Sequence, residues 1–146
     1  MPSLSELYQN VILEHNRSPR NYRVMEDADR RAVGNNPVCG DSFTVWLKLD
    51  GAVIRDVTFH GMGCAISRAS ASLMTAAVKG KTLHDAEEVF HRFHRLVTGQ
   101  TEAGDTETLG KLAVFSGVSA YPTRVKCASL PWHALKAALS ADNPTT

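Results

Sequence analysis

Three widely separated cysteines constrain the fold more than any other feature of the sequence. Cys39, Cys64 and Cys127 each lie in a short segment of turn character, and Asp41 follows the first of them closely. An odd number of thiols argues against a disulfide framework, and the chain has no Cys-x-x-Cys pair. A shared cation would therefore need the whole fold to gather its ligands. Three thiolates and one carboxylate suit zinc, so the sequence predicts one zinc site at Cys39, Asp41, Cys64 and Cys127.

The length and charge of the chain narrow the class of protein. It has 146 residues and a formal charge of +1, with dispersed basic residues. This size favours one domain over residues 1–140, followed by a disordered tail at 141–146. The charge argues against a nucleic-acid partner, and no apolar run or secretory pattern indicates a membrane span or export. We therefore expect a cytoplasmic protein whose reducing surroundings keep its thiols available.

A β-hairpin is the clearest secondary-structure signal. Residues 42–49 and 53–59 are rich in strand formers, and Asp50-Gly51 between them favours a tight turn. Because such strands are antiparallel neighbours, the segments that carry Cys39 and Cys64 should meet at one end of the hairpin. The polar stretch 16–37 before it predicts an extended connection.

Helical patterns account for most of the remaining chain. The predicted helices cover residues 4–15, 64–78, 82–97, 109–118 and 128–139. The segment 98–108 predicts a polar loop. Cys64 should lie at a helix N-terminus, where the helix dipole favours a thiolate. Cys127 should immediately precede the last helix, with Pro131 in its first turn.

Each candidate ligand also has an ordinary structural explanation. A lone cysteine is often a small buried hydrophobic residue, and Asp41 alone would be a turn cap or a solvated loop residue. Zinc with three thiolates and one carboxylate carries two excess negative charges. Arg124 and Lys126 are candidates to offset them, although both also fit ordinary exposed charges.

Three histidines suggest a second metal site, since His84, His91 and His94 fall roughly on one helix face. The charged residues around them favour a solvated polar face instead. The serines after Cys64 show no Ser-His-Asp pattern, which gives a hydrolase little support.

Five short blocks of the sequence occur in a family-specific order. They lie at residues 7–15, 19–21, 36–41, 61–67 and 124–128, and they include Asn-Pro-Val-Cys-Gly-Asp and Arg-Val-Lys-Cys-Ala. Together they resemble the IscU/NifU family of iron–sulfur cluster assembly proteins, specifically its SufU-like branch, over essentially the whole chain. The resemblance implies an α+β fold in which a small antiparallel β-sheet of about three strands packs with helices. The third strand should lie N-terminal to Cys39 or just before Cys127.

Departures from the scaffold-type members of this family favour the SufU-like branch. The stretch between Cys64 and Cys127 is longer, with an insertion over part of residues 81–108. Lys126 stands where scaffold-type members have a histidine, which leaves Asp41 as the fourth ligand. Residues 120–124 also differ from the Leu-Pro-Pro-Val-Lys segment that serves a chaperone, so chaperone-assisted cluster release is not expected.

The resemblance implies a zinc-dependent sulfurtransferase that accepts persulfide sulfur from a SufS-type cysteine desulfurase. The sulfur would pass to downstream SUF components for iron–sulfur cluster assembly. Cys39 has the acceptor role in this prediction, and Arg124 contacts the surroundings of the zinc or the desulfurase. Zinc would hold the thiols as protected thiolates until the partner frees one. The alternatives are a scaffold that binds an iron–sulfur cluster or iron with the same ligands, a structural zinc module, and a thiol–disulfide oxidoreductase.

Overall fold

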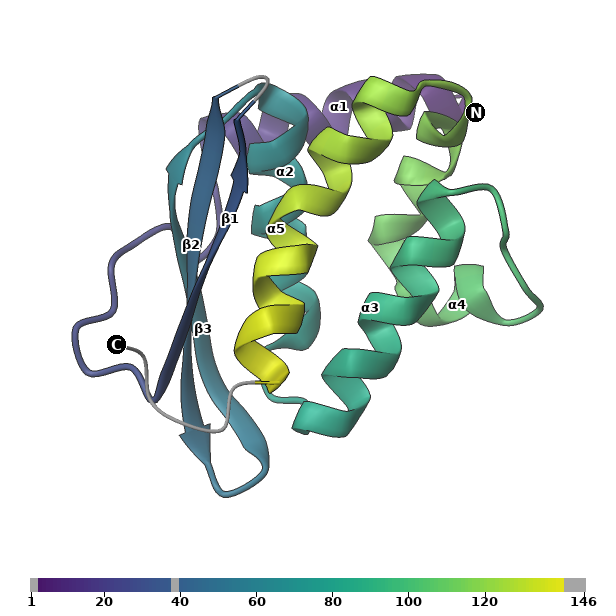
Figure 1. Cartoon of the computed structure of the whole chain (residues 1–146). Helices are drawn as coiled ribbons and strands as arrows, with labels where there is room; N and C mark the ends of the chain where they lie inside the picture. The colour runs from purple at the N-terminus through teal and green to yellow at the C-terminus, as the bar shows by residue number, and fades with distance from the viewer. Residues whose placement is uncertain (1–2, 38–39, 141–146) are drawn as a thin grey trace.

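The computed structural model describes residues 3–37 and 40–140, and a three-stranded antiparallel sheet forms one side of it (Figure 1). The elements follow in the order α1 (Leu4–Arg17), β1 (Arg30–Asn36), β2 (Asp41–Asp50), β3 (Val53–Met62), α2 (Ala65–Val78), α3 (Leu83–Val97), α4 (Asp105–Leu109), the 3-10 helix η1 (Gly110–Ala120) and α5 (Pro122–Ser140). The strand order is β1-β2-β3. The predicted α+β class is confirmed. The tail predicted at 141–146 lies outside the described residues.

The hairpin of β2 and β3 forms where the sequence predicts it. Asp50 pairs with Val53, so the turn itself is Gly51-Ala52, and Gly51 has a φ of 61° that favours glycine. At the opposite end, Ser42 pairs with Met62. This end of the hairpin therefore places the start of β2 beside the segment that follows β3.

The third strand, β1, lies N-terminal to Cys39, which is one of its two predicted places. It pairs with β2 from Arg30 opposite Leu47 to Asn36 opposite Asp41. The prediction of an extended connection is wrong for these residues. Their sequence, Arg-Arg-Ala-Val-Gly-Asn-Asn, is poor in strand formers, so pairing with β2 determines their conformation.

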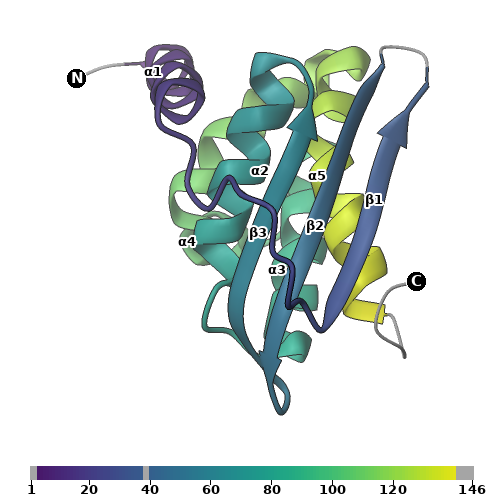
Figure 2. The same cartoon turned by 90° about the vertical axis from the view of Figure 1, so that its left-hand side faces the viewer.

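The loop between α1 and β1 crosses the face of the sheet that the helices leave uncovered (Figure 2). The backbone N–H of Arg23 donates to the carbonyl of Phe59 at 3.0 Å, and that of Asp29 donates to the carbonyl of Leu47 at 2.8 Å. These bonds attach the loop to β3 and then to β2.

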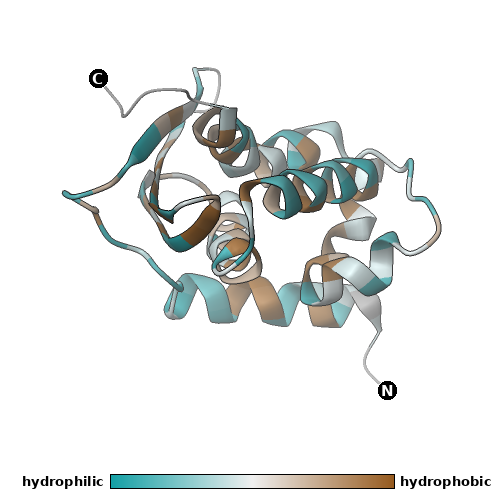
Figure 3. Cartoon of the chain, turned by 90° about the horizontal axis from the view of Figure 1, so that it is seen from below, coloured by the Kyte–Doolittle hydropathy of each residue, from teal (hydrophilic) through white to brown (hydrophobic). Residues whose placement is uncertain are grey.

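The core lies between the sheet and the helices, with α5 between the sheet and α3 (Figure 1). The rings of Phe93 and Trp132 stack at 4.4 Å between centroids and join α3 to α5. Phe43 and Phe59 fill the sheet side of the core. Hydrophilic and hydrophobic residues alternate along α1, as expected for an amphipathic helix at the surface (Figure 3). A membrane-crossing helix is absent from the described residues.

The last helix begins earlier than predicted. It starts at Pro122, since a proline in the first turn needs no N–H donor, and Cys127 therefore lies inside α5 and not before it. Pro131 is in the interior of the helix and not in its first turn. The predicted loop 98–108 also contains the start of the short helix α4, and the helix predicted at 109–118 is η1.

Candidate metal centre

Three of the predicted ligands come from separate elements that meet at one end of the sheet. Asp41 is the first residue of β2, Cys64 is the N-cap of α2, and Cys127 lies in α5. The hairpin brings Asp41 and Cys64 together, as the sequence predicted. Cys127 reaches the same end because α5 packs against both α2 and the sheet.

The ligand atoms of these three residues are close enough to share an ion. A carboxylate oxygen of Asp41 and the sulfur atoms of Cys64 and Cys127 all lie within 4.8 Å of one another. In a tetrahedral zinc site with Zn–S near 2.3 Å, neighbouring ligand atoms are about 3.5–3.8 Å apart. A contraction of about 1 Å would bring the three donors to that spacing. Two thiols and a carboxylate suit a borderline-soft cation such as zinc or iron.

Asp41 is a buried carboxylate that the protein does not neutralise. Its exposed fraction is 7%. It accepts a hydrogen bond from the Ser67 hydroxyl at 2.9 Å and a long one from the Cys64 N–H at 3.4 Å. Within residues 3–37 and 40–140, no lysine or arginine forms an ion pair with it. A buried charge of this kind needs a counter-charge, so the position fits a bound cation.

Cys64 is the exposed member of the cluster and caps its helix. Its sulfur accepts a hydrogen bond from the N–H of Ser67 at 3.5 Å. The free amides and the dipole of a helix N-terminus stabilise an anionic sulfur. The predicted position of Cys64 at the start of α2 is therefore confirmed.

Pro131 explains a contact that the sequence did not predict. Because proline has no N–H, the carbonyl oxygen of Cys127, four residues earlier, lacks its usual partner in the helix. The Ser67 hydroxyl lies 3.0 Å from this oxygen and donates to it or to Asp41, since it has a single hydrogen. The same hydroxyl lies 3.5 Å from the sulfur of Cys64. Ser67 therefore connects all three candidate ligands.

Sequence reasoning missed Ser67 as a site residue. Two signals for it are present in the sequence. Ser67 is three residues after Cys64, at the position where an N-cap side chain meets a backbone amide, and Pro131 marks the Cys127 carbonyl as available. Their meeting depends on how α2 packs against α5, which the sequence pattern does not specify.

Arg124 and Tyr8 lie beside the same cluster. Burial raises the pKa of the Tyr8 hydroxyl; the Arg124 guanidinium opposes this rise, and the thiols of Cys64 and Cys127 reinforce it. The Tyr8 hydroxyl oxygen is buried and has no hydrogen-bond partner in the described part of the chain. The guanidinium of Arg124 also lies 4.5 Å from the centre of the Tyr121 ring. The structure thus places Arg124 near the predicted metal site.

Lys126, another predicted residue, is not part of this three-residue group. Lys126 is exposed and lines a groove with Asn36 and His133. Cys39, the predicted fourth ligand and sulfur acceptor, lies outside the described residues, between Pro37 and Gly40.

The histidines of α3 have separate surroundings. His91 lies 3.8 Å from Glu87, and the ring of His94 stacks on that of Phe90. Among the described residues, Asp41, Cys64 and Cys127 form the one group of three or more metal-binding side chains. The structure therefore brings together three of the four predicted ligands of the primary site and does not bring His84, His91 and His94 into such a group.

Comparisons with known proteins agree with this geometry. Residues 7–128 match the family model described as the NifU-like N-terminal domain. The chain is 42% identical to the zinc-dependent sulfurtransferase SufU of Bacillus subtilis, covering 92% of this chain and 90% of that protein. It is 37% identical to the iron–sulfur cluster assembly scaffold protein IscU of Streptococcus pyogenes, covering 95% and 86% of the two chains. A solved structure of a putative SUF-system scaffold protein from Fervidobacterium islandicum superposes with a TM-score of 0.85 at 36% identity, covering 92% and 97% of the two chains.

Proposed function

The chain belongs to the NifU-like N-terminal domain family, and we propose that it is a zinc-dependent sulfurtransferase of the SufU type. It accepts persulfide sulfur from a SufS-type cysteine desulfurase in the cytoplasm and passes it to downstream SUF components for iron–sulfur cluster assembly. Its similarity to a zinc-dependent sulfurtransferase over most of both chains supports this function. The observation that carries it is the buried carboxylate of Asp41, which faces two thiols and forms no ion pair with a lysine or arginine among residues 3–37 and 40–140.

Asp41, Cys64 and Cys127 would hold the zinc, with Cys39 as the fourth ligand. When bound, zinc keeps coordinating thiols deprotonated at neutral pH. The N–H of Ser67 donates to the Cys64 sulfur at the N-terminus of α2, and the Ser67 hydroxyl restricts the orientation of the Asp41 carboxylate.

In the transfer step, the thiolate of Cys39 attacks the outer sulfur of the persulfide on the desulfurase cysteine. A new sulfur–sulfur bond forms on Cys39, and the sulfur–sulfur bond of the desulfurase breaks. The desulfurase cysteine leaves as a thiolate, so the charge balances: one thiolate is consumed at Cys39 and one is formed on the desulfurase, and the proton of the persulfide stays with the transferred sulfur. No external oxidant or reductant is required, because one disulfide-type bond replaces another.

Sulfur transfer by a Cys39→Ser variant tests this assignment. Zinc-loaded wild-type protein should stimulate turnover of a SufS-type desulfurase, and the peptide that contains Cys39 should gain the mass of one sulfur atom. The variant should remain folded, lack the added sulfur and fail to stimulate turnover. Full stimulation by Cys39→Ser would contradict the acceptor role, and global unfolding of the variant would favour a structural zinc module.

The scaffold alternative has support from the names of relatives such as the Streptococcus pyogenes protein. Thiolates bind iron as well as zinc, so the donor set alone does not separate the two functions. Anaerobically isolated protein should be colourless and contain one zinc per chain if the proposal is correct. A brown protein with iron and acid-labile sulfide in place of zinc would instead indicate a scaffold.

A further inference from the structure

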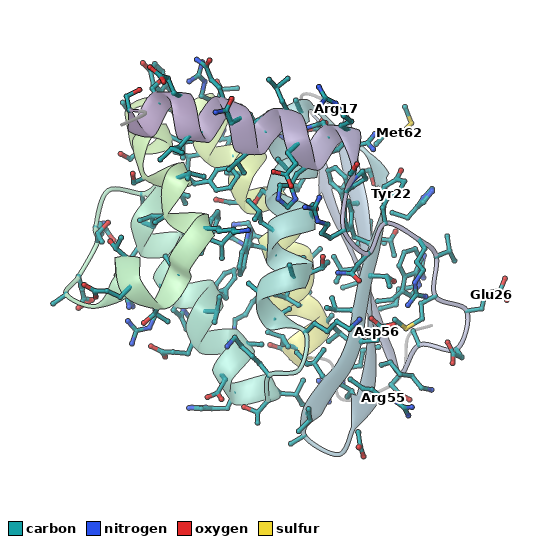
Figure 4. The ribbon with its side chains drawn as sticks, turned by 180° about the vertical axis from the view of Figure 1, so that it is seen from behind. Arg17, Tyr22, Glu26, Arg55, Asp56 and Met62 are labelled. Carbon is teal, nitrogen blue, oxygen red and sulfur yellow. The ribbon has the colours of Figure 1, made fainter. Side chains whose placement is uncertain are left out.

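Met62 is the most exposed of the large hydrophobic side chains in the described residues, with 80% of its surface accessible. It is the last residue of β3 and stands two positions before Cys64. Figure 4 shows its side chain projecting from this end of the molecule. Because Met62 stands so near Cys64, a molecule that approaches the metal centre would also meet this side chain.

The segment after α1 is attached to the same corner. The Tyr22 hydroxyl donates to the carbonyl of Gly61 at 2.9 Å, and the side-chain amide of Asn16 donates to the carbonyl of Ala65 at 2.8 Å. These bonds place Arg17 and Tyr22 on the surface around Met62, and all three side chains lie at this end of the molecule in Figure 4. We call the surface formed by Arg17, Tyr22, His60, Met62 and Arg68 the Met62 face.

The Met62 face carries two arginines without acidic partners. Arg17 is exposed and has no hydrogen bond or ion pair with the residues that the structure describes. The guanidinium of Arg68 lies 5.0 Å from the centre of the Tyr22 ring, and its Nε atom is buried without a hydrogen-bond partner there. His60 stacks on the same ring at 4.8 Å. This corner therefore has positive charge that the described side chains leave unbalanced.

On the opposite part of the same sheet, several basic side chains have acidic partners. Arg23 and Lys79 both form ion pairs with Asp56, the latter at 3.4 Å, and Lys48 lies 3.8 Å from Asp27. Most cations there have an acidic neighbour. Arg17 and Arg68 lack such neighbours among the described residues, so the Met62 face is suited to carboxylates from outside the chain.

We propose that the Met62 face is the docking surface for the cysteine desulfurase, an inference that rests on the proposed function. Met62 enters an apolar recess on the desulfurase, and carboxylates at the border of that recess pair with Arg17 and Arg68. A partner that presents a persulfide to the metal centre must also cover Met62, because two residues span about 7 Å at most. Methionine and arginine are both enriched in protein interfaces, and a central apolar anchor with a charged border is typical of them.

Two substitutions with matched controls test this surface. Met62→Asp and Arg17→Glu should each raise the concentration of this protein that half-saturates desulfurase turnover by about ten-fold or more. The controls Val53→Asp and Arg55→Glu also replace an apolar and a basic side chain by an acidic one, at the far end of β3, where both side chains are exposed. They should leave the half-saturating concentration unchanged. Added salt should weaken docking of the wild type more than that of Arg17→Glu. The zinc content should be the same in all five proteins.

Three outcomes would overturn the docking surface. One is an unchanged half-saturating concentration for Met62→Asp. Another is that Arg17→Glu loses zinc but keeps the half-saturating concentration of the wild type, which would mean that Arg17 supports the metal centre and not docking. The third is a dimeric wild type that Met62→Asp makes monomeric without changing desulfurase binding, which would assign the face to self-association. Binding to the desulfurase should also be measured by calorimetry, beside turnover. If the proposed function is wrong, the partner binds but no sulfur is transferred, and this result differs from the three outcomes above.

Discussion

Two buried aspartates in this molecule have opposite surroundings. Asp105, with no exposed surface, accepts hydrogen bonds from Arg95 at 2.8 Å, from Arg92 at 3.1 Å and from the N–H of Glu102 at 2.8 Å. Asp41 is almost as buried, yet its partners are a hydroxyl and one distant amide. The protein neutralises the first carboxylate with its own cations and leaves the second charge unbalanced beside two thiols.

The difference separates a structural carboxylate from a metal-binding one. A buried charge is costly unless an opposite charge accompanies it. For Asp105 the two arginines meet this need, and the result is to attach α4 and its preceding loop to α3. For Asp41 the need is met when a cation binds between it, Cys64 and Cys127. Burial alone would not have distinguished the two residues, whereas the nature of their partners does.

Removal of the Asp41 carboxylate should have the largest effect. Asp41→Ala should weaken zinc binding by about a hundred-fold or more, since loss of a ligand should exceed the loss expected for an outer partner of a ligand. The metal-free variant should be at least as stable as metal-free wild type, because an unbalanced buried charge has gone. Competition with a chromophoric chelator measures the affinity, and thermal unfolding in chelator measures the stability. If metal-free Asp41→Ala were clearly less stable than metal-free wild type, Asp41 would be a structural carboxylate like Asp105.

Asp105→Asn should show the opposite pattern. The variant leaves Arg92 and Arg95 beside a neutral side chain, so its melting temperature should fall by about 5 °C or more. Its zinc content and zinc affinity should match those of the wild type, because the side-chain partners of Asp105 are Arg92, Arg95 and the N–H of Glu102, none of which is a candidate ligand. Loss of zinc by Asp105→Asn would show that the two carboxylates are not independent.

Ser67→Ala should have a smaller effect, confined to the metal end. The hydroxyl donates its single hydrogen to the Asp41 carboxylate or to the Cys127 carbonyl, so its removal should weaken zinc binding by about ten-fold. Ser72 is a matched control, since its hydroxyl is also buried in α2 but bonds to His15 and the N–H of Arg20. Ser72→Ala should alter stability and leave zinc affinity unchanged. Equal zinc affinities for wild type and Ser67→Ala would exclude the orienting role.

The smallest expected effect is on how the free energy of unfolding depends on pH in acid. The hydrogen bond from Arg95 holds the pKa of Asp105 well below its ordinary value of 3.8. A group whose pKa is lower in the folded state stabilises the fold above its unfolded pKa and loses that contribution as the pH falls through the folded value. The difference in stability between zinc-free wild type and Asp105→Asn should therefore be constant above about pH 5 and should shrink below about pH 4. Denaturant unfolding at a series of pH values measures it, and a difference that grows in acid would contradict the role of the Asp105 charge.

The sequence predicted the hairpin, the helix start at Cys64 and the meeting of Asp41 with Cys64, because turn and capping signals are local. It predicted β1 only as one of two alternatives, since Arg30–Asn36 becomes a strand through pairing with β2. The placement of Pro131 in the first turn of the last helix is wrong, because that helix starts earlier, at Pro122. Asp105 lay in a predicted polar loop, and its partners on α3 could be found only after packing was known. The partners of Asp41, and hence its unbalanced charge, likewise depend on how the start of α2 lies against the start of β2.

Zinc K-edge X-ray absorption of the purified full chain tests the central claim most directly. The account predicts one zinc per chain with three sulfur ligands near 2.3 Å and one oxygen ligand near 2.0 Å, from Cys39, Cys64, Cys127 and Asp41. Asp41→Ala should change the oxygen contribution and keep the sulfur ligands that remain, whereas Asp105→Asn should give the wild-type spectrum. A zinc shell made of nitrogen and oxygen alone, or a spectrum that Asp41→Ala does not alter, would contradict the account.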